Sequence, residues 1–217
     1  MVSIMKKIVL VGAGGHCKVI IDIIKSIEEF EIVGITDKSN ICGNLLGIPI
    51  IGDDEVLQDL FNKGVEYAFV SLGSIDNLAF RYELYKKLKQ IGFKVPTLIH
   101  KNSIVSPYAS IEEGVCIMAN AVVNANAYVG KNSIINTSSI IEHDCIIGDN
   151  CHISPGAKLG GNCKIGNNVH IGIGATVIHS INIGENTTIG AGAVVIDNIG
   201  DNKVAVGVPA KIIKTKV

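Results

Sequence analysis

Residues 129–164 read, in groups of six, VGKNSI INTSSI IEHDCI IGDNCH ISPGAK LGGNCK. Each group begins with a branched aliphatic residue, and its fifth residue is small. A period of six fits neither an α-helix, which repeats every ~3.6 residues, nor an alternating strand, which repeats every ~2. It fits a solenoid of short strands with a corner after each one. The frame runs without a slip through sixteen groups, which begin with Val105, Ile111, Ile117, Val123, Val129, Ile135, Ile141, Ile147, Ile153, Leu159, Ile165, Ile171, Val177, Ile183, Ile189 and Val195.

The hexad positions predict where each side chain points. The fifth residue and the next first residue are two apart, so both face inward from one short strand. Glycine and asparagine at positions two to four suit corners that need unusual backbone angles. Three hexads per coil would give a triangular prism with about 18 residues per turn. Glycine fills position two at Gly130, Gly148, Gly160, Gly166, Gly172, Gly184 and Gly190.

The first part of the chain has a different pattern. A strand expected over 6–11 ends in Gly12-Ala13-Gly14-Gly15-His16, and a helix with Val19, Ile20, Ile23, Ile24 and Ile27 on its apolar face follows. A second strand over 31–36 ends at Asp37. A glycine loop at a helix start can bind phosphate through backbone N–H groups, although a tight turn explains it equally well. Cys17 occupies the place of the third glycine of the dinucleotide fingerprint, which disfavours NAD.

Further alternation of strand and helix completes this part. We expect an extended run over 48–51, a helix that opens at Asp53, and a strand over 67–72. A longer helix capped by Asp76 or Asn77 should reach about Gln90, and an extended run covers 93–99. We therefore predict an α/β, Rossmann-like domain over residues 1–97 and a parallel β-helix over residues 98–217.

The composition excludes several classes. The net charge of −1 gives no broad basic surface for nucleic acid. No run of about 18 apolar residues predicts a membrane span. Met1 to Lys7 lead directly into a strand, so no signal peptide is expected. Of the six cysteines, Cys145, Cys151 and Cys163 occupy the small inward column. We expect all six to be reduced and the protein to be cytoplasmic.

One corner carries candidate catalytic chemistry. His143 falls at position three of its hexad and should be exposed. A neutral imidazole there can act as a general base near pH 7. Either Glu142 or Asp144 could orient its ring, and the spacing leaves that choice open. The alternative is an exposed histidine with no role.

Four stretches carry a family resemblance: Gly12 to His16, Leu98 to Lys101, Asn136 to Asp144, and Val206 to Lys211. With them the chain resembles the sugar N- and O-acetyltransferases of the NeuD type, and most closely the UDP-4-amino-sugar N-acetyltransferases of the bacillosamine pathway. The resemblance implies a left-handed β-helix and acetyl-CoA-dependent acetylation of the 4-amino group of a nucleotide-linked, UDP-type amino-deoxy sugar. It further implies a nucleotide-sugar substrate, a homotrimer with sites between subunits, and no metal.

The resemblance also implies roles for particular residues. His143 would be the general base, Asp144 its orienting acid in place of the usual glutamate, and Glu142 and Asn136 would set the sugar amine. Lys38 stands where a second acid often follows Asp37, which leaves the nucleotide open. The implied substrate-binding residues are Gly12, Gly14, Gly15, His16 and Asp37, and the implied acetyl-CoA-binding residues are His152, Gly172, Gly190 and Lys211.

Two histidines and two basic residues remain. His152 and His170 both occupy position six and should stack on successive coils, about 4.8 Å apart. The resemblance places His152 near the thioester carbonyl, whereas His170 is expected at the surface or in a subunit contact. Lys211 and Lys214 could meet the CoA phosphates or simply be solvated.

Three other functions stay open at this point. A sialic-acid-type O-acetyltransferase would use the same scaffold on a hydroxyl group. A γ-carbonic-anhydrase-like metalloenzyme would need three histidines; His143 and His179 share a column, but Gly184 stands where the third would be. A purely structural solenoid would leave the stretch from Asn136 to Asp144 without a role.

Overall fold

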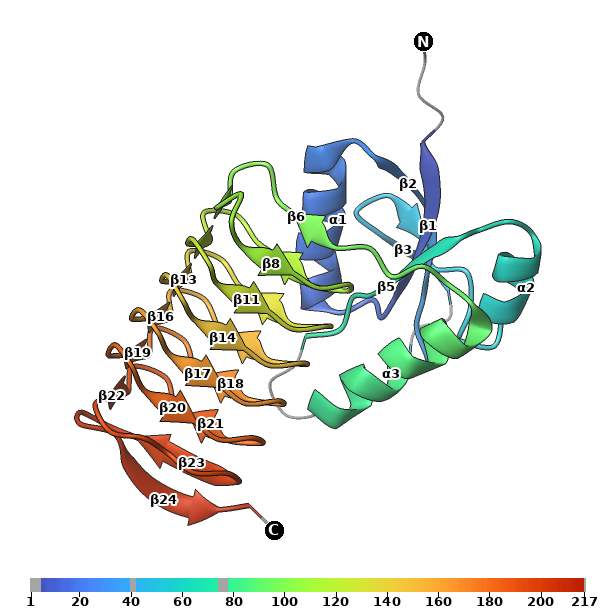
Figure 1. Cartoon of the computed structure of the whole chain (residues 1–217). Helices are drawn as coiled ribbons and strands as arrows, with labels where there is room; N and C mark the ends of the chain where they lie inside the picture. Colours follow the sequence, from blue (N-terminus) through green and yellow to red (C-terminus); the bar gives the residue numbers. More distant parts are fainter. Residues whose placement is uncertain (1–4, 40–41, 74–77, 217) are drawn as a thin grey trace. The chain divides into compact units, whose positions relative to one another are not determined.

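A computed structural model describes residues 5–39, 42–73 and 78–216 (Figure 1). Contacts divide the chain into two compact units, Met1–Lys101 and Asn102–Val217. The expected helix cap at Asp76 or Asn77, and Met1 to Ile4, lie outside the described residues. In the part of the chain that the structure covers, no helix has the length and apolar character that crossing a membrane requires.

The first unit is built on a parallel three-stranded sheet in the order β2-β1-β5, as the alternating pattern predicts. Short pieces complete it: β3 and β4 pair as an antiparallel hairpin, and β6 lies at its end. Its elements are β1 (Lys6–Val11), α1 (Gly15–Ile27), β2 (Phe30–Thr36), β3 (Asn44–Leu45), β4 (Ile48–Pro49), α2 (Leu57–Asn62), β5 (Tyr67–Val70), α3 (Leu78–Ile91) and β6 (Leu98–Ile99).

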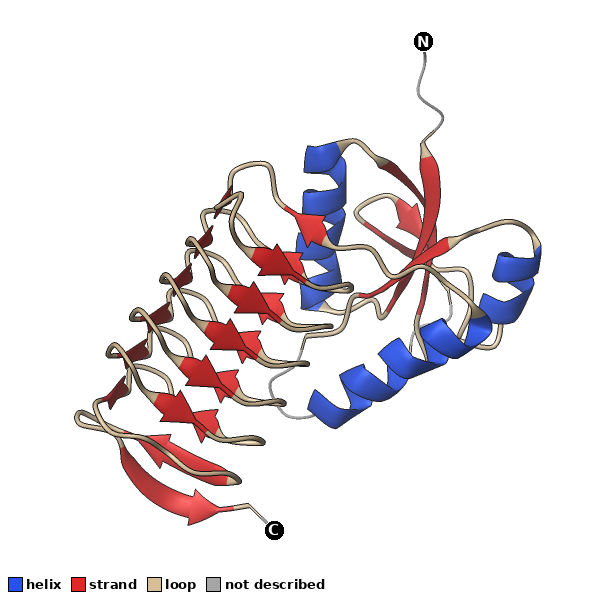
Figure 2. Cartoon of the chain, in the orientation of Figure 1, coloured by secondary structure: helices blue, strands red, loops and turns tan. Residues whose placement is uncertain are grey.

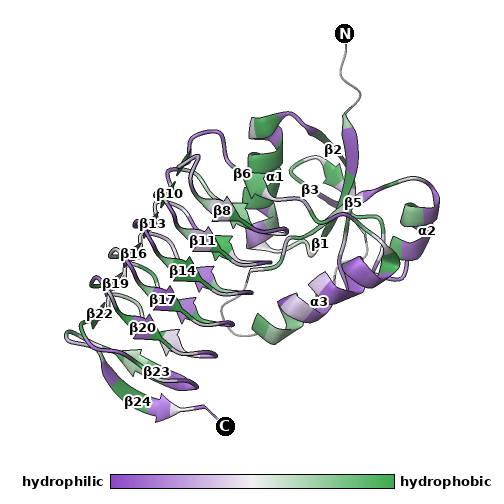
Figure 3. Cartoon of the chain, in the orientation of Figure 1, coloured by the Kyte–Doolittle hydropathy of each residue, from purple (hydrophilic) through white to green (hydrophobic). Residues whose placement is uncertain are grey.

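The helices depart from the expected pattern in detail. Val19 is 36% exposed, and Ile21 is buried in its place on the core face of α1. The second helix begins at Leu57 and not at Asp53, because residues 54–56 form a turn before it. Much of α3 is hydrophilic (Figure 3), yet Arg81 is buried and donates from Nη1 to the carbonyl oxygens of Val70 and Leu72.

The second unit is a parallel β-solenoid of about six turns (Figure 2). Each two-residue strand pairs with the strand 18 residues away, as in Val122 with Ile140. Three sheets result, with the orders β22-β19-β16-β13-β10-β7, β20-β17-β14-β11-β8 and β24-β23-β21-β18-β15-β12-β9. The strands are β7 (Ile104–Val105), β8 (Ser110–Ile111), β9 (Cys116–Ile117), β10 (Val122–Val123), β11 (Tyr128–Val129), β12 (Ile134–Ile135), β13 (Ile140–Ile141), β14 (Ile146–Ile147), β15 (His152–Ile153), β16 (Lys158–Leu159), β17 (Lys164–Ile165), β18 (His170–Ile171), β19 (Thr176–Val177), β20 (Asn182–Ile183), β21 (Thr188–Ile189), β22 (Val194–Val195), β23 (Lys203–Val206) and β24 (Lys211–Thr215).

The inward columns form the core of this unit. From Ile117 to Val195 every first-position aliphatic side chain is buried, whereas Val105 and Ile111 of the first coil are half-buried. The thiols of Cys145, Cys151 and Cys163 point into this core, at most 1% exposed, as small apolar fillers do. Each buried branched side chain contributes about 1.5–3 kcal/mol before the entropy cost is subtracted.

The corners need left-handed backbone angles at one position only. Position four has a positive φ from Gly114 to Gly192, and asparagine or glycine fills most of these places. The expectation of unusual angles at the position-two glycines is wrong, because none of them has a positive φ. These positions require glycine because the neighbouring chain leaves no room for a side chain. For example, a Cβ on Gly148 would lie 2.8 Å from the backbone N of Asn167 on the next coil.

Candidate functional site

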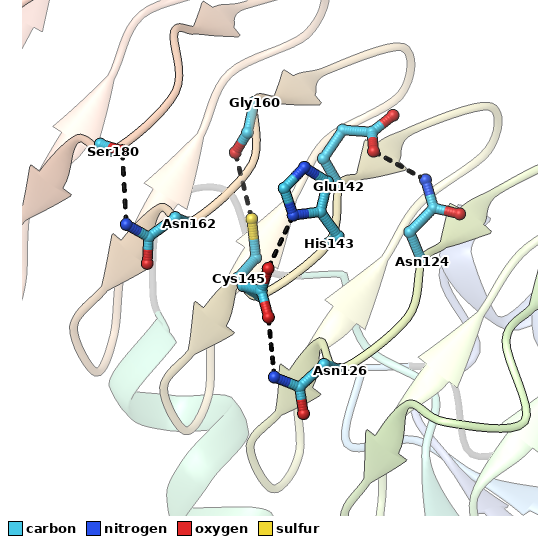
Figure 4. A network of polar contacts seen from close by, with 9 residues as sticks. Asn124, Asn126, Glu142, His143, Cys145, Gly160, Asn162 and Ser180 are labelled. Atoms are coloured by element: carbon cyan, nitrogen blue, oxygen red, sulfur yellow. Dashed lines mark hydrogen bonds and ion pairs between the residues drawn. The ribbon is translucent and has the colours of Figure 1, made fainter.

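The corner after β13 exposes His143, as its hexad position predicts. Ile141, two residues earlier, has its side chain buried in the core, whereas the side chain of His143 is 62% exposed. Its Nδ1 lies 2.7 Å from Oδ2 of Asp144 (Figure 4). Since a carboxylate only accepts, Nδ1 carries the proton and Nε2 presents its lone pair. A base with this tautomer can remove a proton from a bound amine or hydroxyl group.

Of the two acids that the sequence left open, Asp144 is the one that contacts the ring of His143. Its Oδ1 accepts a 2.7 Å hydrogen bond from Nδ2 of Asn126, one coil earlier. The hydrogen bond from Asn126, and then the one with His143, hold the pKa of Asp144 below its usual value. The hydrogen bond with Asp144 raises the pKa of His143, partial desolvation opposes it, and the charges of Asp144 and Glu142 raise it further.

Glu142 takes a different direction from the same corner. Its Oε2 accepts a 2.9 Å hydrogen bond from Nδ2 of Asn124, again one coil earlier (Figure 4). Both carboxylates of the corner are therefore held by amides of the preceding corner. Asn124 and Asn126 were not expected from the sequence, although each lies 18 residues before its partner, which is the length of one coil.

Gly161 is another site residue that sequence reasoning missed. It occupies the position of His143 on the next coil, and a Cβ there would lie 2.7 Å from both Cε1 and Nε2 of the imidazole. Its φ is not in the left-handed region, so the requirement is steric. A signal existed, because Gly161 is the sole glycine at position three among the sixteen hexads of the sequence.

Asn136 and His152 form a second polar group, on the sheet that contains β12 and β15. Nδ2 of Asn136 lies 3.0 Å from Nε2 of His152, and Oδ1 of Asn136 accepts from the backbone N–H of Thr137. The amide therefore donates to Nε2 of His152. The rings of His152 and His170 stack as expected, with centroids 5.2 Å apart. His152 is 4% exposed, although its strand position faces outward.

The residues expected to bind acetyl-CoA along the solenoid are spread over several coils. Gly172 has a packing reason to be glycine, since a Cβ would lie 2.6 Å from the backbone N of Ala191. A Cβ on Gly190 would lie 2.6 Å from Cγ1 of Val206. Lys211 is exposed at the start of β24. Their binding roles stay predictions.

The first unit holds a pocket of about 100 Å³ where β1, β2 and β5 end at their carboxyl edge. Gly12, Asp37, Lys38, Asp54 and Phe80 are among its lining residues. Asp37 accepts hydrogen bonds from the backbone N–H of Ala13 at Oδ2 and of Ser39 at Oδ1. It therefore ties the glycine loop to the end of β2, the edge at which open α/β sheets bind their ligands.

The glycines of the loop differ from one another. Gly12 has a φ of 102° and a Cβ there would collide with the side chain of Leu72. Gly14, the N-cap of α1, and Gly15 have no left-handed φ, and a Cβ on either would enter open space. His16 follows them in the first turn of α1 and is half-buried. The fold accounts for Gly12 and leaves the next two glycines without a packing reason.

Within residues 5–39, 42–73 and 78–216, no three His, Cys, Asp or Glu side chains gather closely enough to hold an ion. His143 and His179 lie two coils apart with Gly161 between them in the same column.

Comparisons with known proteins cover both units. The profile of the PglD N-terminal domain matches residues 7–88, and that of the bacterial transferase hexapeptide (six repeats) matches residues 126–161 and 162–197. The chain is similar to PerB of Caulobacter crescentus, solved with CoA and GDP-perosamine, at 36% identity, with 97% of this chain and 99% of that chain covered and a TM-score of 0.91.

Two further solved structures resemble it over nearly the whole length. The acetyltransferase domain of PglB from Neisseria gonorrhoeae is 35% identical, with 96% of this chain and 100% of that chain covered and a TM-score of 0.91. WeeI from Acinetobacter baumannii is 26% identical over 96% of this chain and 100% of that one, with a TM-score of 0.84.

Proposed function

Because the chain belongs to the hexapeptide-repeat sugar N-acetyltransferases of the PglD/NeuD type, we propose that it transfers the acetyl group of acetyl-CoA to the 4-amino group of a nucleotide-linked amino-deoxy sugar. The observation that carries this proposal is the exposed His143–Asp144 pair in a chain that aligns over 97% of its length with PerB. PerB is a GDP-perosamine N-acetyltransferase, and a PglB acetyltransferase domain has been solved with acetyl coenzyme A.

His143 acts as the general base of a direct transfer. The amine nitrogen attacks the thioester carbonyl carbon, a C–N bond forms, and the C–S bond of the thioester breaks. Nε2 of His143 accepts the proton that the amine loses and returns it to the thiolate of CoA, so the products are the amide and the free thiol. Asp144 keeps the proton on Nδ1 and stabilises the imidazolium that forms between these two steps.

Other residues stabilise the oxyanion of the thioester and position the sugar amine. A backbone N–H group or His152 stabilises the negative charge that develops on the thioester oxygen. Asn136 donates to Nε2 of His152, so it can set the position of that ring. Glu142 and Asn136 set the sugar amine, and Gly172, Gly190 and Lys211 bind along the length of acetyl-CoA.

The first unit supplies the nucleotide site. Gly14 and Gly15 leave open space at the start of α1, where backbone N–H groups favour a phosphate. Gly12, His16 and Asp37 complete the site around the pocket at the sheet edge. We favour UDP as the nucleotide. GDP is the second candidate, because PerB has been solved with GDP-perosamine. Lys38 also lines the pocket beside Asp37, at the place where the family resemblance leads us to expect a second acid.

The assembly belongs to the same proposal. His143 and the pair of Asn136 and His152 lie on different corners and faces of one prism, and a homotrimer would let neighbouring chains complete each site. Exposed apolar side chains on the outer strands, Ile146 among them, suit such a contact. The buried inward cysteines agree with a cytoplasmic protein.

The proposal is tested by thiol release from acetyl-CoA with UDP-, dTDP- and GDP-linked 4-amino sugars and with sialic acid. We expect the highest kcat/KM with a UDP-linked amino sugar. A higher value with the GDP-linked sugar would move the assignment to GDP. Acetylation of sialic acid hydroxyls, without transfer to any amine, would overturn the proposal in favour of O-acetylation.

A further inference from the structure

The corner that precedes His143 by one coil carries Asn126, at position four of its hexad. Its φ is 60°, and the φ of Asp144 at the same position of the next coil is 59°. The two side chains therefore stack along one column, and Nδ2 of Asn126 donates to Oδ1 of Asp144 at 2.7 Å (Figure 4).

Several side chains at position four donate a hydrogen bond to the same position of the next coil. Asn132 donates to Asn150, and Asn150 donates to Asn168, at 3.0 and 2.8 Å. An amide can accept from one coil and donate to the next, but a carboxylate only accepts. At Asp144 the ladder ends, because a carboxylate cannot donate to the next coil: Oδ1 accepts from Asn126, and Oδ2 lies 2.7 Å from Nδ1 of His143.

We infer that Asn126 is a positioning residue for the reaction, which acts on His143 through Asp144. It holds one oxygen of the carboxylate so that the other oxygen faces the imidazole. This inference rests on the proposed function, because it assigns Asn126 a part in preparing the general base. Asn126 itself need not contact either substrate.

The pKa of His143 depends mainly on Asp144, because the corners of the neighbouring coils carry no charge. The preceding corner presents Asn124, Ala125 and Asn126, and the following corner presents Gly160, Gly161 and Asn162, all uncharged. Among the residues that the structure describes, the charges that raise the pKa of His143 are those of Asp144 and Glu142 of its own corner, and the Asp144 hydrogen bond is the largest cause. A carboxylate released from Asn126 would hold the ring less well, so the pKa of His143 should fall.

The chain offers a matched control for a test. Asn162 occupies the same hexad position two coils after Asn126, with the same φ of 60°, and its Nδ2 donates to Oγ of Ser180 at 3.3 Å. Asn126→Gly and Asn162→Gly each remove one inter-coil amide and keep a residue that tolerates this φ. Asn126→Ser is a second variant, since Ser138 and Ser180 already occupy position four with positive φ.

Two measurements are made on the full-length chain. The pKa of His143 is followed by NMR titration of its ring proton, assigned by comparison with His143→Ala, and kcat, KM and the pH profile of kcat/KM are measured. We expect Asn126→Gly and Asn126→Ser to lower the pKa of His143, to move the acidic limb of the profile to lower pH, and to reduce kcat about 10-fold with KM little changed. Asn162→Gly should leave the pKa and the profile as in the wild type.

The outcomes separate two failures. If the Asn126 variants titrate and turn over like the Asn162 control, Asn126 has only a structural role and the inference is wrong. If the wild-type chain acetylates no amino sugar, the proposed function fails, whereas the NMR titration still reports whether Asn126 controls His143. An unchanged pKa in both Asn126 variants would overturn the inference in either case.

Discussion

Nδ1 of His143 lies 2.7 Å from Oδ2 of Asp144, its neighbour along the chain. Residues of the preceding and the following coil support this contact. Asn126 of the preceding coil holds Asp144, and Gly161 of the following coil leaves room for the ring. The solenoid thus fixes one imidazole by stacking three corners, and the proposed chemistry depends on that stack.

Asp144→Asn should weaken the base and change its pH dependence. Only unprotonated His143 can accept a proton, so activity falls as the pH drops through its pKa. Asp144 raises that pKa above the ordinary value of about 6.5. Asparagine suits the left-handed corner, so we expect kcat to fall about 10-fold or more and the acidic limb to move to lower pH. The pH profile of kcat/KM measures both effects.

A control carboxylate shows whether the effect is specific. Asp149→Asn removes a carboxylate that accepts from the backbone N–H of Lys131 on another corner. This variant should leave the acidic limb of the pH profile of kcat/KM unchanged. A wild-type profile in Asp144→Asn would mean that Asp144 does not orient the base.

Gly161→Ala should lower kcat without removing any functional group. The new Cβ would lie 2.7 Å from Nε2 of His143, and the ring must move away from it. We expect kcat to fall about 10-fold or more, because a misplaced base transfers protons poorly. Gly200→Ala is the control, since a Cβ there meets nothing within 4 Å. Equal kinetics in the two variants would show that the ring tolerates the displacement.

Gly148→Ala should lower stability and leave the chemistry intact. Its Cβ would lie 2.6 Å from Oδ1 of Asn167 and 2.8 Å from the backbone of the next coil. Forcing a methyl group between coils costs about 1–3 kcal/mol. Thermal unfolding should show a lower Tm than in Gly200→Ala. An unchanged Tm would indicate that the coils separate at little cost.

Asp37→Ala should raise KM for the sugar nucleotide and leave KM for acetyl-CoA unchanged. Asp37 lines the pocket of the first unit and ties the glycine loop through Ala13. Asp53→Ala removes a carboxylate that accepts from the backbone N–H of Glu55, and it serves as a control for general effects on this unit. Weaker use of acetyl-CoA with normal use of the sugar nucleotide would reverse the placement of the two substrates.

The repeat made the solenoid predictable, because its inward columns fix the register of every coil. The direction of a side chain on a corner is another matter. Glu142 and Asp144 flank His143 equally in the sequence, and each accepts from an asparagine one coil earlier, but only Asp144 also contacts the ring. Those partners lie one coil away, so an 18-residue spacing applied to the corners as well as to the core would have found them.

The first unit was less accessible to the same reasoning. The order of strands and helices followed from the apolar pattern, but the core face of α1 was shifted, with Ile21 inside and Val19 at the surface. The burial of Arg81 could not be read from a helical pattern, because it depends on two carbonyl oxygens near the end of β5. The periodicity of a helix in the sequence cannot identify hydrogen-bond partners that belong to another element.

The most direct test of the account is the turnover of His143→Ala with acetyl-CoA and the best amino sugar from the substrate panel. The side chain is exposed, so the variant should fold like the wild type. We predict that kcat falls by about 10²-fold or more, as expected when a general base is lost. Turnover at the wild-type rate would contradict the central claim that this imidazole accepts the proton of the amine.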